Sequence, residues 1–155
     1  MLKLSNQVVK PEWIDYNGHM NVAYYTMAFD NVMDEMLTCH LGIDHQFITQ
    51  NKMGPFALQS NFTYLAEMHQ GDVFYGCARI LDYDHKKMHL FATLHNTKDD
   101  VLSATMEGLS INVDHHTRRA IPYPTQILEK IELLHKKSRD LPTPEQVGKI
   151  IGIRR

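Results

Sequence analysis

Cysteine and long apolar runs are scarce in this 155-residue sequence. Its two cysteines, Cys39 and Cys77, are too few for the disulfide framework of a small secreted protein, so we expect reduced thiols and a cytoplasmic location. No apolar run approaches the ~20 residues of a membrane-spanning helix. Residues 1–6 are too short and too polar for a secretory signal. The sequence therefore predicts neither a disulfide-stabilised nor a membrane protein.

Blocks of one charge sign are also missing. The 16 Lys and Arg and the 18 Asp and Glu residues are interspersed, and the net charge is −2. This balance argues against a nucleic-acid-binding protein. The ten histidines are scattered, and neither an HxH nor an HExxH motif occurs. His115 and His116 follow Asp114, but no second ligand cluster accompanies them, so we expect no metal and no cofactor.

Enough apolar residues remain for one folded core, with 43% hydrophobic and 22% charged residues. A short strand is predicted within 7–14, where Pro11 interrupts the ladder. Alternating patterns predict further strands over 56–66, 73–83, 88–95 and 101–113, and their short polar turns indicate an antiparallel meander. The segment 43–55 is expected to be a connection. Helices are predicted over 125–138 and, shorter, over 145–150.

The longest helical pattern covers residues 22–41. Asn21 is placed to cap its start and Gly42 to end it. A helix of this length can bury its apolar stripe only by lying across the sheet. The predicted fold is α+β, with a long central helix wrapped by a curved antiparallel sheet of about five strands. Residues 1–124 form this domain, and 125–155 are a helical extension packed on it. Pairing of free sheet edges would give a dimer.

A cluster of reactive and turn-forming residues lies directly before this helix: Asp15, Asn17, Gly18, His19 and Asn21. The first backbone N–H groups of a helix lack internal partners and carry partial positive charge. A carboxylate beside them can attack a carbonyl group, or activate water, while the amides hold the oxyanion. Each of four residues also has a structural interpretation. Asp15 would form an Asx-turn or cap the helix, and Asn21 would cap it. Gly18 would serve the turn, and His19 would be a hydrogen-bonded structural histidine.

The string Asp15-Tyr-Asn17-Gly18-His19-Met-Asn21-Val-Ala-Tyr24 resembles that of hotdog-fold thioesterases of the 4-hydroxybenzoyl-CoA thioesterase type. Later features agree with this resemblance, which covers residues 7–124: Gly71-Asp72, and Val113-Asp114 before Thr117-Arg118-Arg119. The stretch 11–20 is also similar to that of thioesterases found with carnitine catabolism, which act on betainyl-CoA.

The resemblance implies hydrolysis of an acyl-CoA in a site at a homodimer interface, with homotetramers as a further assembly. Asp15 takes the position of the nucleophile or general base. Asn17 and His19 match positions that orient substrate or water. The amides near Val22 and Ala23 would polarise the thioester carbonyl.

Two further hypotheses concern substrate recognition. Trp13, with Tyr16 or Tyr24, is a candidate cation–π wall for a trimethylammonium acyl group. The alternative for Trp13 is packing under the helix start. Candidates for binding the CoA phosphates are the cationic side chains Lys86, Lys87, Arg118 and Arg119. Ordinary solvated surface charge is the alternative for each of them.

Two other functions remain open from the sequence alone. One is a hydratase or dehydratase on the same fold, in which Asp15 and His19 form the acid–base pair. The other is a protein that binds acyl-CoA without hydrolysing it. An enoyl-CoA absorbance assay distinguishes the first from a thioesterase, and thiol release distinguishes the second.

Overall fold

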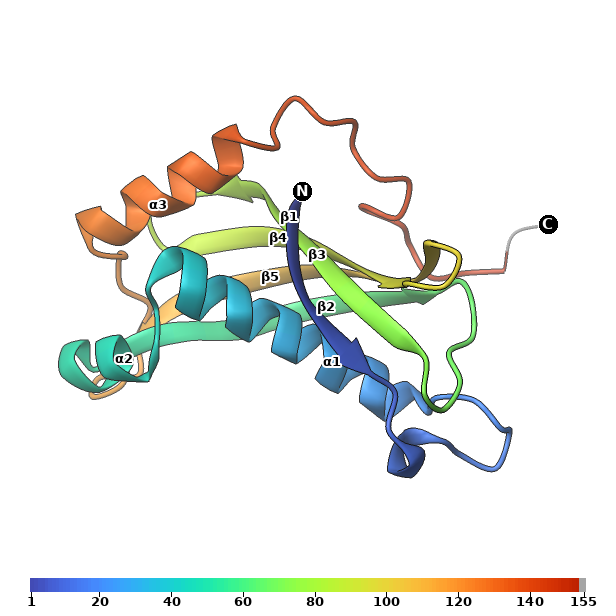
Figure 1. Ribbon diagram of the computed structural model, residues 1–155. Helices are drawn as coiled ribbons and strands as arrows, with labels where there is room; N and C mark the ends of the chain where they lie inside the picture. Colours follow the sequence, from blue (N-terminus) through green and yellow to red (C-terminus); the bar gives the residue numbers. More distant parts are fainter. Residues whose placement is uncertain (154–155) are drawn as a thin grey trace.

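One antiparallel sheet curves around one long helix in the computed structural model, which describes residues 1–153 (Figure 1). The strands run in the order β1-β3-β4-β5-β2. Their bounds are Leu2–Val8 (β1), Met53–Tyr64 (β2), Val73–Tyr83 (β3), Lys87–Asn96 (β4) and Val101–Asp114 (β5). The predicted α+β class, with a helix inside a curved five-stranded sheet, is confirmed.

The central helix α1 (Val22–Glu35) continues into a π-helical turn, η2 (Met36–Leu41). The turn ends at Gly42, whose φ of 73° is left-handed. The side chain of Asn21 caps the start of α1 by accepting from the Ala23 N–H. The predicted extent, its cap and its stop are therefore confirmed. The apolar side of α1 packs against the concave face of the sheet, where Gly76 lets Val32 approach closely.

The predicted strand order is wrong at β2. Only β3, β4 and β5 form the expected meander, whereas β2 pairs with β5, from Met53 opposite Asp114 to Tyr64 opposite Ala104. The connection 65–72 is longer than a hairpin turn and passes the start of α1, where the Met20 N–H donates to the Met68 carbonyl. That path carries the chain from one edge region of the sheet to the other.

Three local predictions also need correction. The first strand lies earlier than expected, because Pro11 begins a 3₁₀ turn, η1 (Pro11–Trp13), instead of continuing the ladder. The expected connection 43–55 contains a short helix, α2 (His45–Asn51), which Asp44 caps by accepting from the Phe47 N–H. Residues 145–148 form turns, and the described chain has no helix over 145–150.

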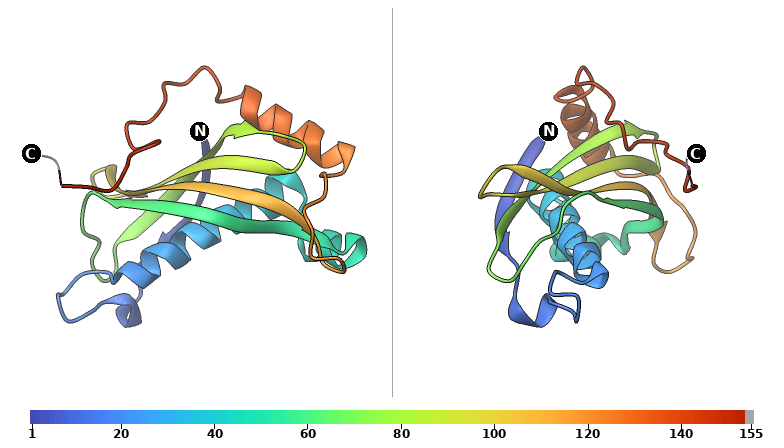
Figure 2. Two further views of the ribbon diagram at one scale, coloured as in Figure 1. Left: turned by 180° about the vertical axis from the view of Figure 1, so that it is seen from behind. Right: turned by 90° about the vertical axis from the view of Figure 1, so that its right-hand side faces the viewer.

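The C-terminal part packs on the same sheet (Figure 2). Helix α3 (Thr125–Lys136) buries Ile127 and Ile131 in the shared core. The Arg79 guanidinium, on β3, donates to the Pro142 carbonyl at 2.8 Å. Further on, the Gly148 N–H donates to the Glu107 carboxylate, also at 2.8 Å. These contacts tie residues 125–149 to β3 and β5.

Strand β2 forms one edge of the sheet and has no neighbour on its outer side within residues 1–153. Residues 57–60 of this edge are exposed, and Leu58 forms a bulge with 53% of its surface open. Long exposed edges of this kind are templates for pairing with another chain. None of the helices described is long and apolar enough to cross a bilayer.

Candidate active site

The turn before α1 is organised by the Asp15 carboxylate. Its Oδ1 accepts from the Asn17 N–H at 2.8 Å, and its Oδ2 accepts from Asn21 Nδ2 at 3.1 Å. Asn21 in turn accepts the Ala23 N–H at 3.0 Å through Oδ1. Gly18 has φ of 84° and closes the turn by donating to the Asp15 carbonyl. Asp15 is therefore both the Asx-turn residue and a carboxylate fixed at the helix start.

The first amide of α1 is the free one. Ala23 N–H is used by the Asn21 cap, and Tyr24 N–H donates to the Asn21 carbonyl at 3.0 Å. Val22 N–H has no acceptor among residues 1–153. Of the two amides expected to polarise a carbonyl group, Val22 therefore supplies the available donor at the positive end of the helix.

His19 faces a groove of about 360 Å³ at the same helix start. Its Nδ1 lies 3.2 Å from the Met20 carbonyl, which can only accept, so Nδ1 carries the hydrogen and leaves Nε2 free. Three lining residues that sequence reasoning missed are Tyr25, Tyr64 and Glu67. Tyr25 comes from α1, Tyr64 from the end of β2 and Glu67 from the connection 65–72, and no local motif connects them with the turn.

The two tyrosines of this groove form an edge-to-face pair, with ring centroids 5.2 Å apart. The Tyr25 hydroxyl donates to the Ala66 carbonyl at 3.3 Å. Burial raises the pKa of both phenols above the ordinary value of tyrosine, so both remain protonated at neutral pH.

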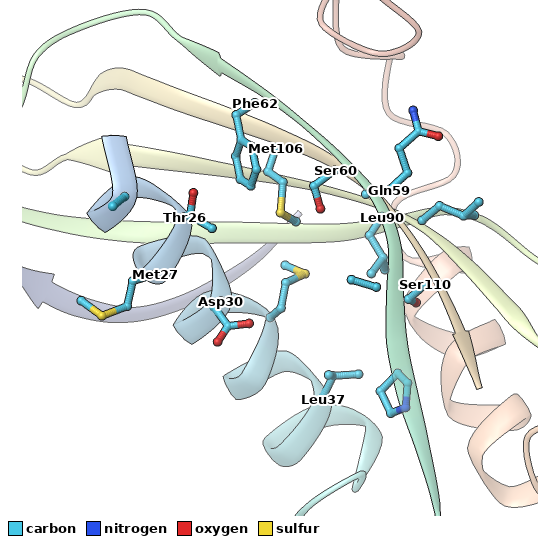
Figure 3. Close-up of a pocket in the computed structure, with 16 residues that line it drawn as sticks. Thr26, Met27, Asp30, Leu37, Gln59, Ser60, Phe62, Leu90, Met106 and Ser110 are labelled. Atoms are coloured by element: carbon cyan, nitrogen blue, oxygen red, sulfur yellow. The ribbon is translucent and has the colours of Figure 1, made fainter. Parts of the chain in front are cut away.

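A second hollow, a cavity of about 500 Å³, lies between α1 and the strands β2 and β5 (Figure 3). Met33, Phe62 and Met106 contribute to its mainly apolar lining, and Asp30 adds one carboxylate. Ala23 lines this cavity, whereas its neighbour Val22 lines the groove. Neighbouring residues at the start of α1 thus line different hollows.

Trp13 packs under the helix start instead of lining an open cage. It is 5% exposed, and its ring stacks on that of Tyr24 at 5.5 Å. The Lys10 ammonium lies 5.7 Å from the same ring. Tyr16 is 96% exposed and takes no part in the stack. The structure therefore favours the packing interpretation of Trp13 over the proposed wall.

The four cationic candidates lie at the other end of the sheet from the turn. Lys86 and Lys87 belong to the β3–β4 hairpin, and their N–H groups donate to Asp84. Arg118 lies 4.9 Å over the Phe56 ring, and Arg119 follows it. This end of the sheet is where Met53 of β2 pairs with Asp114 of β5. Tyr64, which lines the groove near the turn, is eleven residues further along β2. Within one chain they do not meet the turn before α1.

The Asp114-His115-His116 cluster forms a turn of its own. Asp114 accepts hydrogen bonds from the backbone of Thr117 and of His116, and the first of these holds the pKa of its carboxyl below the usual value. Over residues 1–153, no three His, Cys, Asp or Glu side chains gather into a group able to hold a metal ion.

Comparison with known proteins identifies the family. Residues 9–131 match the family model described as the Thioesterase-like superfamily. The chain belongs to this superfamily. It is a thioester hydrolase with the hotdog fold, as the resemblance of the turn implied.

Three relatives illustrate the match. A betainyl-CoA thioesterase of Pseudomonas aeruginosa is 30% identical over 145 residues, which are 94% of this chain and 91% of that protein. A Rhizobium protein, L-carnitine dehydrogenase/betainyl-CoA thioesterase, is 27% identical over 99% of this chain, which spans only 31% of that protein. A Staphylococcus aureus protein in complex with CoA has a TM-score of 0.91 and 34% identity, over 99% of this chain and 98% of that chain.

Proposed function

We propose that this enzyme hydrolyses a small or polar acyl-CoA at the start of α1, with betainyl-CoA as the specific substrate. The observation that carries the proposal is the free Val22 N–H at a helix start whose cap, Asn21, also holds the Asp15 carboxylate. The Pseudomonas aeruginosa relative supports the acyl group.

The chemistry needs an attacking oxygen and a donor for the developing oxyanion. Val22 N–H points along the positive end of α1 and takes the thioester oxygen. Asp15 either removes a proton from water or attacks the carbonyl carbon itself, and CoA leaves as the thiol. The hydrogen bonds from Asn17 and Asn21 fix the carboxylate, whose oxygens each keep a second lone pair. His19 Nε2 is available to orient substrate or water.

Each of the two hollows binds a different part of the substrate. The apolar cavity beside Ala23 receives the acyl group, and the open groove beside Val22 and His19 receives the pantetheine arm. This division places the thioester at the boundary, where the free amide lies. Thr26 and Phe62 then contact the acyl group.

A homodimer through β2 completes this site, and such dimers can pair further into tetramers. Antiparallel pairing of two β2 edges brings the far end of the partner's sheet beside the turn of this chain. The partner's Arg118 and Arg119, with the partner's Lys86 and Lys87, then approach the phosphates of CoA. This arrangement accounts for the separation of those residues from Asp15 within one chain.

The test is thiol release from a panel of short, branched, aromatic and betainyl CoA esters. We expect Asp15→Asn to lower kcat by about 10²- to 10⁴-fold, the usual contribution of a general base, with KM little changed. Asp44→Asn is the matched control, because Asp44 caps α2 in the same way but lies outside the site. Near-normal turnover by Asp15→Asn would remove Asp15 from the mechanism.

A further inference from the structure

Among residues 1–153, Asp30 is the single charged side chain in the lining of the cavity between α1 and β2. Figure 3 shows Asp30 on α1, between Thr26 and Leu37 along the helix. No hydrogen bond or ion pair to this carboxylate occurs within residues 1–153. Thr26, Gln59, Ser60 and Ser110 supply the other polar groups, and none of them is cationic.

An acyl group that fills this cavity displaces water from Asp30. Asp30 is an exposed residue in the single chain, and a carboxylate that loses part of its water without gaining a cation raises the free energy of the complex. A neutral acyl chain leaves Asp30 in that state. A positively charged acyl chain compensates it, so the lining selects for charge as well as for size.

The spacing along α1 suits a short cationic acyl group. Val22 and Asp30 are eight residues apart, about 12 Å along the helix, and Asp30 leans back toward the N-terminus. A hydrogen bond of about 3 Å, a carbonyl group, two single bonds and an ammonium–carboxylate contact of about 4 Å together span about 10 Å. An ammonium two bonds from the thioester carbon therefore reaches Asp30 while its carbonyl meets Val22 N–H.

We propose that Asp30 is the specificity-determining residue that pairs with a quaternary ammonium group on the acyl chain. This inference rests on the proposed function and places the cation between α1 and β2, instead of at Trp13. Glu67, the other carboxylate near the helix start, is less suited to that role. It lines the groove beside Val22 and His19 instead of this cavity, and the His69 ring lies 3.7 Å from its carboxylate.

The experiment compares two CoA esters of nearly identical shape. Betainyl-CoA carries a trimethylammonium group, and 3,3-dimethylbutanoyl-CoA carries the neutral tert-butyl group in its place. We expect the wild type to prefer betainyl-CoA, and Asp30→Asn to lower the ratio of the two kcat/KM values by about 10- to 100-fold. Asp34→Asn, one turn further along α1 and outside the cavity lining, should leave the ratio at the wild-type value.

Each outcome of this comparison has a distinct meaning. An unchanged ratio in Asp30→Asn, confirmed with Asp30→Ser, overturns the role of Asp30. Equal or faster hydrolysis of the neutral ester by the wild type also overturns it, while the thioesterase mechanism stands. Absence of thiol release from every ester overturns the proposed function itself, and the role of Asp30 falls with it. Melting temperatures of all variants show whether each is folded.

Discussion

At the residue scale, the turn before α1 gives single side chains two roles each. Asp15 closes an Asx-turn and also presents a carboxylate at the helix start. Asn21 caps Ala23 with its oxygen and holds Asp15 with its nitrogen. Because Asn21 occupies the Ala23 amide, it selects Val22 as the remaining donor. The structural role of Asp15 in the turn is therefore compatible with the chemical role that we propose for its carboxylate.

Tyr123 carries a residue-scale prediction about stability. It is buried, and its hydroxyl makes no hydrogen bond of normal geometry among the residues described, although the Ser110 side chain lies close by. Burial raises its pKa above the ordinary value of about 10. The unfolded chain therefore ionises first, so the contribution of Tyr123 to stability is complete below pH 10 and is lost as the pH rises above it.

We expect Tyr123→Phe to be neutral, or to stabilise the fold by up to about 1 kcal/mol, at pH 7, because it removes an unpaired buried hydroxyl. Its advantage over the wild type should grow above pH 10. Urea unfolding at pH 7 and at alkaline pH measures both effects. Destabilisation by Tyr123→Phe at pH 7 would show that the hydroxyl has a partner.

Sequence reasoning located the turn but not the walls of the site. Asp15, Asn17, His19 and Asn21 are close in sequence, so their conjunction is visible as a string. Tyr64 and Glu67 reach the same groove from more than 40 residues away, through the fold alone. The sequence offered two candidate donors, the N–H groups of Val22 and Ala23. The structure excludes Ala23, because its N–H donates to the Asn21 cap.

At the element scale, α1 depends on a close approach to β3. A Cβ atom on Gly76 would stand 2.2 Å from Val32 Cγ2, and the β-branched Val32 has little freedom to turn away. Gly76 therefore sets the distance between helix and sheet, and with it the width of the hollows beside α1.

We expect Gly76→Ala to destabilise the fold by about 1–3 kcal/mol through overpacking. Adding Val32→Ala should recover part of that loss, since the two residues share one contact. Gly108→Ala, on β5 of the same sheet, is the matched control, because the added Cβ would have its nearest neighbour 3.5 Å away. Denaturant midpoints of Gly76→Ala, Val32→Ala, their double variant and Gly108→Ala measure the coupling between residues 76 and 32. Additive effects of the two substitutions would refute the contact.

Local signals in the sequence predicted the elements better than their order. Asn21 and Gly42 mark both ends of the long helix, and Gly71-Asp72 marks the start of β3. The place of β2 depends on pairs such as Tyr64 with Ala104, which are 40 residues apart and carry no local signal. Short turns between successive strands predicted a meander. The connection 65–72 is long enough to carry the chain across the sheet, so β2 pairs with β5 instead of β3.

At the scale of the whole molecule, the exposed β2 edge decides whether the proposed site is complete. The bulged Leu58 lies at the middle of this edge, 53% exposed. Pairing of two edges would bring two copies of this region together across a twofold axis.

If the proposed dimer forms through β2, we expect Leu58→Glu to convert it to monomer, because the substitution places like charges opposite each other in the ladder between subunits. Thiol release should fall in parallel with the dimer fraction. Leu133→Glu, an exposed leucine of α3 at 55%, is the control. Sedimentation velocity and activity are measured at the same concentrations. A fully active Leu58→Glu monomer would contradict a site shared between subunits.

The most direct test of the oxyanion donor removes the backbone N–H of Val22 at the start of α1. Val22 is the first helical residue, where proline is tolerated, and Asn21 has φ of −67° and ψ of 147°, values that suit a residue before proline. Val22→Pro therefore deletes the free N–H and keeps the helix, while Val22→Ala keeps both. If Val22 N–H holds the oxyanion, kcat for thiol release falls by about 10²- to 10³-fold in Val22→Pro alone, with an unchanged melting temperature. Wild-type turnover by a folded Val22→Pro variant would contradict this account.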